Sequence, residues 1–516
     1  MRRQTDLTHK RHGHKQIMQR RDFLKRCSAL GIGATAPTLF GVPGIISQAS
    51  AMPMVDAVDF RTPNVLPQII NIFLYGGASE LAGNLTNMDL INRNSQNPYP
   101  EQLRRSSIDG GQVTPYGFWA DAGGRAMEDM LNSNDMSVYR TINRRKNNTR
   151  AHRPSVFSSL KGSLAIDAAP GMGSTIAALL NAHKSQLEGS TLLGGRQLTD
   201  LVLPFVSFEG STTAFATDPN ANLPLQLRGL SLDQQFENPY SRGRNPVDTE
   251  LEALIEKIVD SSQRVRYDKV HEGFELRRRM ESLIGNLQTA AEQPLPILPN
   301  TATGDLDPDV DPATGYLRYP VNNRYSARIK AAVTLAVNNP DSMFITVGGG
   351  LGGWDDHSSA IEDYVPRMRQ VMEALRVAMK HIRYSDSVHG GTRKTDNIII
   401  KVHGDFGRNV NLNNSEGWDH GNNQNLYTLG GEALRVRGAL GKVVGSTEVF
   451  GPANQNRQYT QPQQGSYEAE PLAIASTVYQ YFGAGNPQAL TRDDALNPNG
   501  DAAIDESIAA EPTFSI

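Results

Sequence analysis

Short apolar segments of strand length constrain the fold of this sequence more than any other feature, and several of them stop at consecutive glycines. The four segments are Gln68–Tyr75, Met343–Val347, Asn397–Val402 and Leu426–Leu429, and all but the third are followed by consecutive glycines. Between the second and the third, apolar residues recur at steps of three and four from Ile361 to Ile382, which predicts a helix. Another helix is predicted near Ser326–Val337. Strands that alternate with helices predict an α/β fold with a largely parallel sheet, covered by helices on both faces.

The rest of the chain is less regular and is expected to extend from this sheet. A long, highly charged helical pattern over Asp248–Gln293 predicts a helical hairpin, within an insertion around residues 209–304. Pro366 leaves open where the helix that ends near Ile382 begins, because proline fits the first turn of a helix and disrupts later turns. We expect one α/β domain over residues 52–516.

The N-terminal segment has the features of an export signal. Arg20-Arg21-Asp22-Phe23-Leu24-Lys25 is a twin-arginine pattern, and the mildly apolar stretch Ala29–Ile46 follows it. The stretch ends in Ala49-Ser50-Ala51, which has the small-x-small form of a cleavage site. We interpret residues 1–51 as a twin-arginine signal peptide, read by the twin-arginine export machinery, so that the mature chain is exported folded and is periplasmic or secreted. The alternative is a chance arginine pair in a basic tail.

Removal of this segment changes the charge and the cysteine content. The full chain has 51 Lys and Arg and 54 Asp and Glu, and residues 52–516 keep 42 and 52 of them, a net charge of −10. That balance argues against nucleic acid as a partner, because phosphates require a basic surface. Cys27 is the only cysteine, so the mature chain offers no disulfide and no thiolate. No apolar run of about 18 residues follows the signal, so no membrane span is expected.

Two tryptophan motifs with an acid between them form the main candidate site. Trp354-Asp355-Asp356-His357 follows one predicted strand, Asp405 follows the next, and Trp418-Asp419-His420 lies on the loop beyond it. Open α/β sheets bind ligands at the carboxyl ends of their strands, so these loops should meet in one crevice. Carboxylate and imidazole groups bind divalent cations, and zinc often combines both. The alternative is that the acids cap helices and bind loop backbones, and Asp356 suits that role best.

The repeated Trp-Asp-His pattern gives a geometric expectation. We expect His357 and His420 to face the same ion, with Asp355 as a third ligand and Asp419 close behind. The two tryptophans are expected to form apolar walls that exclude water. His403 is left open between a metal ligand and a core or supporting histidine.

Two further acidic patterns resemble parts of calcium-binding loops. Asp305, Asp307, Asp309 and Asp311 alternate with other residues, and Asn497–Asp501 with Asp505 looks like half a loop. Interleaved prolines and the absence of a closing glutamate favour a solvated loop for the first pattern, and the second lacks the required spacing.

The order of the motifs resembles that of a known family. The stretches GGWDDH, DNIIIKVHGDFGRN, WDHG and LYTLGGEA follow one another as the corresponding motifs do in the DUF1501 family, over roughly Val65–Pro452. This resemblance implies membership of the alkaline phosphatase and sulfatase superfamily. It therefore implies a three-layer α/β/α fold and an ester-hydrolysing site with two metals.

The resemblance also implies roles for individual residues. Asp355, His357 and His420 fall on ligands of one metal, and Asp405 falls on a ligand of the other. Asp419 would orient His420 or bind metal directly.

The family position of Arg408 implies that it binds an anionic ester with two hydrogen bonds. That of His152 implies an acid or base role. Two positions depart from the pattern. Ser79 stands where the family has an aspartate metal ligand, and Glu80, one place later, is the candidate to replace that ligand. Ala151 stands where the superfamily has its nucleophilic serine, and Ser155, four residues on, is a weak substitute for it.

These observations predict an exported, metal-dependent hydrolase of phosphate or sulfate esters, carried by small molecules or polymers. A metal-bound water would be the nucleophile, since Ala151 cannot be one. One divalent ion, with zinc as a candidate, has a full set of ligands, whereas the second set is incomplete. The alternative is a catalytically degenerate binding or assembly protein on the same scaffold, because fold does not determine function.

Overall fold

The computed structural model describes most of the chain after residue 54. The described residues are 55–85, 113–147, 149–218, 222–240, 246–261, 268–301, 303–321, 323–349, 353–385, 395–451 and 458–511. All of them belong to one compact unit, Ala51–Ile516. The expected signal peptide and Cys27 lie outside the described residues.

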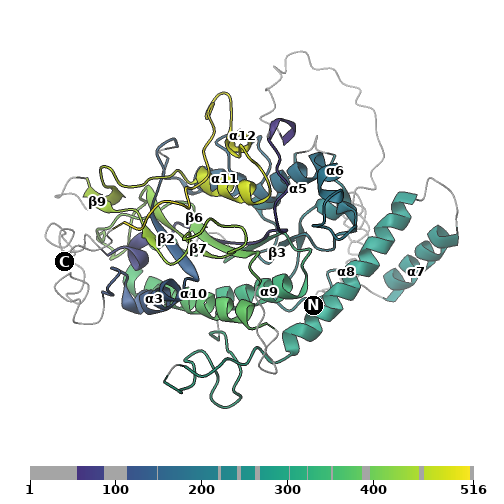
Figure 1. The fold of residues 1–516 in the computed structure, drawn as a ribbon, viewed down its shortest axis with the longest axis horizontal. Coiled ribbons are helices and arrows are strands. Elements are labelled where there is room, and N and C mark those ends of the chain that lie inside the picture. Colours follow the sequence, from purple (N-terminus) through teal and green to yellow (C-terminus); the bar gives the residue numbers. More distant parts are fainter. Residues whose placement is uncertain are drawn as a thin grey trace, which may run out of the picture. The chain divides into compact units, whose positions relative to one another are not determined.

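An eight-stranded, mostly parallel sheet lies at the centre of this unit (Figure 1), in the order β4-β3-β5-β1-β6-β7-β2-β8. Its strands are β1 (Gln68–Leu74), β2 (Met136–Asn143), β3 (Phe205–Ser207), β4 (Leu230–Ser231), β5 (Phe344–Gly348), β6 (Ile398–Gly404), β7 (Asn423–Gly430) and β8 (Val443–Val444). β1 is parallel to both of its neighbours, β5 and β6. β7 is antiparallel to β6 and to β2, so the sheet is mixed at that side.

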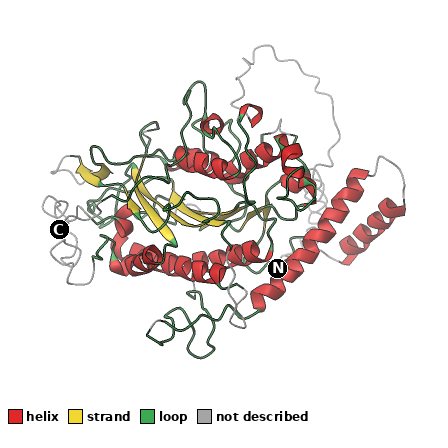
Figure 2. Cartoon of the chain, in the orientation of Figure 1, coloured by secondary structure: helices red, strands yellow, loops and turns green. Residues whose placement is uncertain are grey.

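Helices cover both faces of the sheet, which gives the expected three-layer α/β/α arrangement (Figures 1 and 2). One face carries α3 (Gly124–Asn132), α9 (Arg324–Asn338) and α10 (Ala360–Arg383), and the other carries α4 (His152–Lys161), α5 (Met172–Ala182) and α11 (Leu472–Tyr481). Side chains of a strand alternate between the two faces. In β1, Ile70 and Ile72 accordingly pack in the core under α9 and α10, whereas Ile69 and Phe73 pack under α5 and α11. Such a strand is buried on both sides, which explains its nearly continuous apolar sequence.

The predicted helical hairpin corresponds to two helices, α7 (Pro246–Ser261) and α8 (Asp268–Glu292). An ion pair between Arg277 and Glu252, 3.0 Å apart, joins them. The remaining regular elements are α6 (Lys184–Glu188), α12 (Gln488–Thr491), the hairpin of β9 (Thr447–Phe450) and β10 (Tyr459–Pro462), and the 3₁₀ helices η1 (Val55–Ala57), η2 (Glu80–Gly83), η5 (Ala120–Ala122), η6 (Leu198–Asp200), η7 (Thr213–Phe215) and η8 (Leu225–Leu227). Within the part of the chain that the structure describes, no helix combines the length and the apolarity needed to cross a membrane.

Pro366 does not lie in the first turn of its helix, which is the turn that proline fits best. α10 begins at Ala360, so the proline lies in the second turn of the helix and not in the first. Proline there removes one backbone hydrogen bond. The buried face of the helix, which includes Tyr364, Met368 and Met372, offsets that cost by packing against the sheet.

Neither acidic pattern is simply solvated, because cationic side chains of the chain itself bind to both. Lys380 Nζ lies 2.7 Å from Asp307 and 2.6 Å from Asp309. Lys146 Nζ donates to Asn497 Oδ1 at 2.8 Å and to Asp501 Oδ1 at 2.9 Å. Asp305 is exposed, as expected for a solvated loop, whereas Asp307 and Asp309 form ion pairs with Lys380. An ammonium group is thus bound to the oxygens of both patterns.

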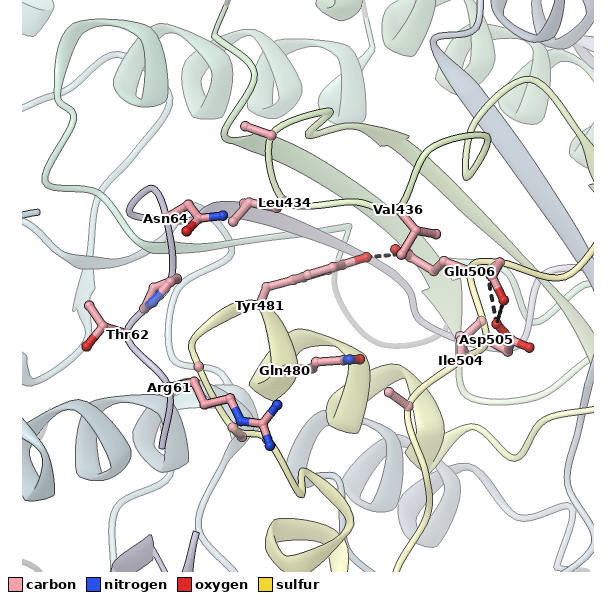
Figure 3. Close-up of a pocket in the computed structure, with 17 residues that line it drawn as sticks. Arg61, Thr62, Asn64, Leu434, Val436, Gln480, Tyr481, Ile504, Asp505 and Glu506 are labelled. Atoms are coloured by element: carbon pink, nitrogen blue, oxygen red, sulfur yellow. Dashed lines mark hydrogen bonds between the residues drawn. The ribbon is translucent and has the colours of Figure 1, made fainter. Parts of the chain in front are cut away.

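A cavity of about 560 Å³ lies at the edge of the sheet where β1 and β6 begin (Figure 3). Residues around Arg61 and Asn64, which lead into β1, line it together with Leu434, which follows β7. Inside the cavity the Tyr481 hydroxyl donates to Glu506 (Figure 3). The candidate site residues follow the opposite ends of β1, β5 and β6, so this cavity is separate from them.

The turn after β1 gives the first testable prediction. Gly76 has a φ of +109°, and a Cβ there would lie 2.6 Å from the backbone nitrogen of Asp355. We expect Gly76→Ala to lower the free energy of unfolding by roughly 3 kcal/mol, because it adds a backbone clash to the strain of positive φ. Gly210, with a φ of +85° and no atom within 4 Å of its Cβ position, is the matched control. Gly210→Ala should cost only about 1–2 kcal/mol. Equal losses in chemical denaturation would contradict a role for close approach at Gly76.

Candidate metal centre

The candidate residues reach one place because their loops leave neighbouring strands at the same edge. Asp355 and His357 lie on the loop after β5, Asp405 directly follows β6, and His420 lies on the loop between β6 and β7. His152 is the first residue of α4. The carboxyl ends of parallel strands form such a crevice in open α/β sheets.

Three imidazoles surround one carboxylate oxygen in this crevice. Asp355 Oδ1 lies 3.0 Å from His357 Nε2, 3.3 Å from His152 Nε2 and 3.5 Å from His420 Nε2. His357 Nε2 and His420 Nε2 are 3.0 Å apart, so these two histidines face each other as expected. The four ligand atoms all lie within 4.8 Å of one another. Zinc bonds of about 2.0–2.1 Å in a tetrahedron place ligand atoms roughly 3.3 Å apart. The cluster could therefore hold one divalent ion.

Two of the three histidines form a hydrogen bond through the other ring nitrogen, and that nitrogen of the third lies near a carboxylate. His152 Nδ1 lies 2.8 Å from Asp405 Oδ2, and His357 Nδ1 lies 3.4 Å from Asp419 Oδ1. His420 Nδ1 donates to the Arg150 carbonyl at 2.6 Å. An acceptor at Nδ1 keeps the proton on that nitrogen and leaves Nε2 free to bind a metal. His152 Nε2 is buried and makes no hydrogen bond, which fits a nitrogen that serves as a metal ligand.

The local electrostatics favour the metal-binding forms of Asp355 and His420 but not that of His152. Burial raises the pKa of the Asp355 carboxyl, but the hydrogen bond and charge of Arg408 outweigh it, so the pKa lies below its usual value. Burial, and then the charge of Arg408, lower the pKa of His420. The hydrogen bond to Asp405 raises the pKa of His152, so this histidine must lose a proton when it binds metal. Asp355 is thus held as an anion and His420 as a neutral imidazole.

The tryptophans of the two motifs lie beneath the site and do not line it. Trp354 and Trp418 are fully buried, and both pack edge-to-face on Tyr364 of α10, with ring centroids 5.9 Å and 5.2 Å away. Trp354 Nε1 also donates to the Tyr325 hydroxyl at 2.6 Å. The expected apolar walls are therefore wrong. The indoles anchor both ligand-bearing loops to the same helix, which gives the repeated motif a physical basis.

Arg408 does not face an anion site. Its side chain is 0% exposed, and each of its three nitrogens donates to groups of the chain. Nε donates to Gly77 O at 2.7 Å, and Nη1 donates to Trp418 O at 2.9 Å. Nη2 donates to Asp355 Oδ1 at 2.6 Å, to Trp354 O at 3.0 Å and to Gly76 O. The second N–H of Nη1 lies toward His357 Nε2, 3.5 Å away. The expected grip on an ester is corrected, since a fully buried guanidinium whose neighbours are all groups of the chain does not present its N–H groups to a substrate.

The other expected ligands also take different places. Asp405 is fully buried, and besides His152 it accepts a hydrogen bond from Gly76 N at 3.1 Å. Glu80 is buried and accepts from Arg408 N at 3.1 Å and from Thr460 Oγ1 at 2.6 Å. Burial raises the pKa of Glu80 to about 7. The structure thus places Asp405 and Asp419 beside the Nδ1 atoms of His152 and His357, and Glu80 lies outside the cluster.

His152 was expected to act as an acid or base, and the structure places it in the cluster of possible metal ligands. Sequence reasoning recognised this residue but missed that role. The arginine and histidine of the RAHRPS stretch were its only signal.

The last three candidates, Asp356, Ser155 and His403, contact only groups that belong to the fold. Asp356 pairs with Arg367 at 3.1 Å, and Ser359 precedes α10 in the capping position, so the expected cap at Asp356 is wrong. Ser155 is buried, with its hydroxyl 3.4 Å from the Thr149 carbonyl. His403 belongs to the core, where burial lowers its pKa to about 3.

The variant Asp405→Asn tests whether Asp405 orients His152 or binds the metal itself. Asp405→Asn should weaken metal binding about 10–100-fold while one ion still binds at saturation, because the variant loses the charge that orients His152. Asp419→Asn is the control. Its carboxylate is half-exposed and 3.4 Å from His357 Nδ1, so we expect a smaller loss. The measurement is a competitive titration against a chromophoric chelator. A variant that binds no ion at saturating metal would make Asp405 a ligand.

Comparison with known proteins gives distant structural matches and one family. A solved structure described as Ps i-CgsB matches at 10% identity and a TM-score of 0.33, over 84% of this chain and 75% of that one. The zinc complex of the C-terminal periplasmic domain of EcEptC from Escherichia coli matches at 8% identity and a TM-score of 0.31, over 83% of this chain and 85% of that one. The phosphonate monoester hydrolase SpPMH from Silicibacter pomeroyi matches at 11% identity and a TM-score of 0.32, over 85% and 78%.

These TM-scores are too low to carry a conclusion about fold or activity. The search of curated proteins found no match. The family described as "Protein of unknown function (DUF1501)" matches residues 67–497 of the 516. The chain therefore belongs to the DUF1501 family.

Proposed function

We propose that this protein is an exported, metal-dependent hydrolase of phosphate or sulfate esters. One observation carries the proposal: three imidazole Nε2 atoms surround Asp355 Oδ1, at 3.0 to 3.5 Å. The Nδ1 atoms of His152 and His420 form hydrogen bonds, and that of His357 lies 3.4 Å from Asp419. His152, Asp355, His357 and His420 would hold the ion, and zinc suits this mixture of imidazole and carboxylate. A bound divalent ion lowers the pKa of water to about 7 and polarises an ester oxygen.

The cluster is open on one side, as a catalytic centre requires. The side chains of His357 and Asp419 are 45% and 48% exposed, whereas Asp405 and Arg408 behind them are fully buried. An ester can therefore approach from the side of His357. Asp419 is the carboxylate on that open side, so it is the group placed to hold a proton during the reaction.

The nucleophile in this proposal is water. Ala151 stands at the cap of α4, directly before His152, and offers no reactive group. Ser155 is fully buried and is directed at the Thr149 carbonyl. The superfamily resemblance supports ester hydrolysis through the order of the motifs, while these two residues argue against a covalent serine intermediate.

A binding or assembly protein is the second candidate, and the same cluster favours it. Four protein atoms can fill a tetrahedral shell completely, and closed shells are typical of structural zinc sites. A catalytic site usually keeps one position for water. In this second candidate, the ion would hold α4 and the two tryptophan loops together without chemistry.

Metal content and turnover separate the two candidates. We expect His152→Ala, His357→Ala and His420→Ala each to weaken metal binding at least about 100-fold, since each removes a ligand. His183→Ala is the matched control, because this half-buried histidine bonds Val55 O, far along the chain from the cluster. The metal-loaded protein should cleave a chromogenic phosphate or sulfate ester and stop when a chelator removes the ion. One bound ion with no turnover of phosphate monoesters, phosphate diesters or sulfate esters would favour the binding protein.

The export proposal rests on residues 1–51 and has its own test. Replacement of Arg20 and Arg21 by lysine should leave the precursor in the cytoplasm, because the twin-arginine receptor reads the arginine pair. Cell fractionation measures this, and N-terminal sequencing of the exported protein should begin at Met52. Normal export of the double-lysine variant would exclude the twin-arginine pathway.

A further inference from the structure

The superfamily resemblance leads one to expect a second metal beside the first, yet the residues that would hold it are engaged. Both carboxylate oxygens of Asp405 are in use, one by Gly76 N at 3.1 Å and the other by His152 Nδ1 at 2.8 Å. Both oxygens of Glu80 are in use as well, by Thr460 Oγ1 and Arg408 N. Neither acid belongs to the cluster of ligand atoms around Asp355. Among the described residues, the group of His152, Asp355, His357 and His420 is the one whose ligand atoms come together around a possible ion.

A cation of the chain lies where these groups converge. The Arg408 guanidinium is 2.6 Å from Asp355 Oδ1, the oxygen shared by the three histidines, and its Nη1 is 3.5 Å from His357 Nε2. Its other acceptors are four backbone carbonyls, those of Gly76, Gly77, Trp354 and Trp418. Carbonyl and carboxylate oxygens in such numbers form the kind of shell that hard divalent cations prefer. Here a planar organic cation binds to all of them.

We propose that the centre binds a single metal ion and that the Arg408 guanidinium is its permanent second cation. This inference rests on the proposed function, because it concerns the same site. The metal is one borderline ion such as Zn²⁺, bound by nitrogen and oxygen ligands, and no Mg²⁺ or Ca²⁺ accompanies it. Arg408 is a positioning residue, since it acts through Asp355 and the loop carbonyls and does not touch a substrate.

The charges around the site agree with this arrangement. One divalent ion and one guanidinium balance the three carboxylates that contact the histidine rings and the Arg408 guanidinium, which are those of Asp355, Asp405 and Asp419. A second divalent ion would add two positive charges beside a buried guanidinium that cannot leave, and like charges at such distances repel strongly. The sequence change near Ser79 is consistent with this, because a metal-binding aspartate there would have no ion to bind.

Metal stoichiometry of the full-length mature protein tests the inference. Protein stripped by a chelator is titrated with Zn²⁺, and bound metal is quantified by mass spectrometry. We expect one equivalent, and no second equivalent at a tenfold higher free metal concentration. Two equivalents would overturn the single-metal centre and leave the proposed hydrolase standing. No bound metal would overturn both.

Two further measurements address Arg408 and Glu80 directly. A crystal structure of the zinc-loaded protein should show one anomalous peak among the histidines, with the guanidinium still on Asp355 and the Gly76 and Gly77 carbonyls. A second peak near Asp405, or a displaced guanidinium, would overturn the inference. Glu80→Gln should bind one equivalent with an affinity within threefold of the wild type, because glutamine keeps the acceptor for Arg408 N. A loss above tenfold would place Glu80 on a metal and also overturn it.

Discussion

The buried guanidinium of Arg408 is the interaction on which the site depends. It joins loops that follow three neighbouring parts of the sheet, through the carbonyls of Gly77 after β1, Trp354 after β5 and Trp418 between β6 and β7. A buried charge is tolerated only when it is fully paired and hydrogen-bonded, so each of these carbonyls must remain in place. Loops that all contact one planar group keep a fixed separation. The residues that follow Trp354 and Trp418, which are Asp355 and Asp419-His420, are therefore held within reach of one ion.

The apolar pattern predicted the centre of the sheet because that pattern follows directly from burial. β1, β5 and β6 are buried on both faces, and their sequences are correspondingly rich in isoleucine, phenylalanine and valine. β2 was not predicted. It is equally buried but contains Arg140 and Asn143, whose partners are the Gly83 carbonyl and Glu468. Partners so distant in the chain cannot be read from local sequence, so a strand with buried polar residues has no apolar signal to reveal it.

The sequence predicted which residues would gather but not which atoms would face the ion. Asp405 and His152 were both candidates, and their roles depend on one contact between residues 253 positions apart, from His152 Nδ1 to Asp405 Oδ2 at 2.8 Å. That contact turns the carboxylate into a support and directs Nε2 toward Asp355. The tryptophans show the same limit. Their repetition predicted two related loops, but the common partner, Tyr364, lies on a helix that no motif included.

An acidic pattern in a sequence can resemble a metal site although, in the folded chain, a lysine from a distant segment binds its carboxylates. Lys380 binds Asp307 and Asp309, and Lys146 binds Asn497 and Asp501, so two calcium-like patterns carry an ammonium group. The histidine cluster differs in kind. Arg408 donates to Asp355 Oδ1 from the buried side, and the three Nε2 atoms gather around the same oxygen, with that of His357 also 3.5 Å from Arg408 Nη1. An imidazole whose Nδ1 proton is donated, as that of His420 is to the Arg150 carbonyl, presents its Nε2 lone pair to a cation, so this cluster fits a metal ion in a way that the two acidic patterns do not.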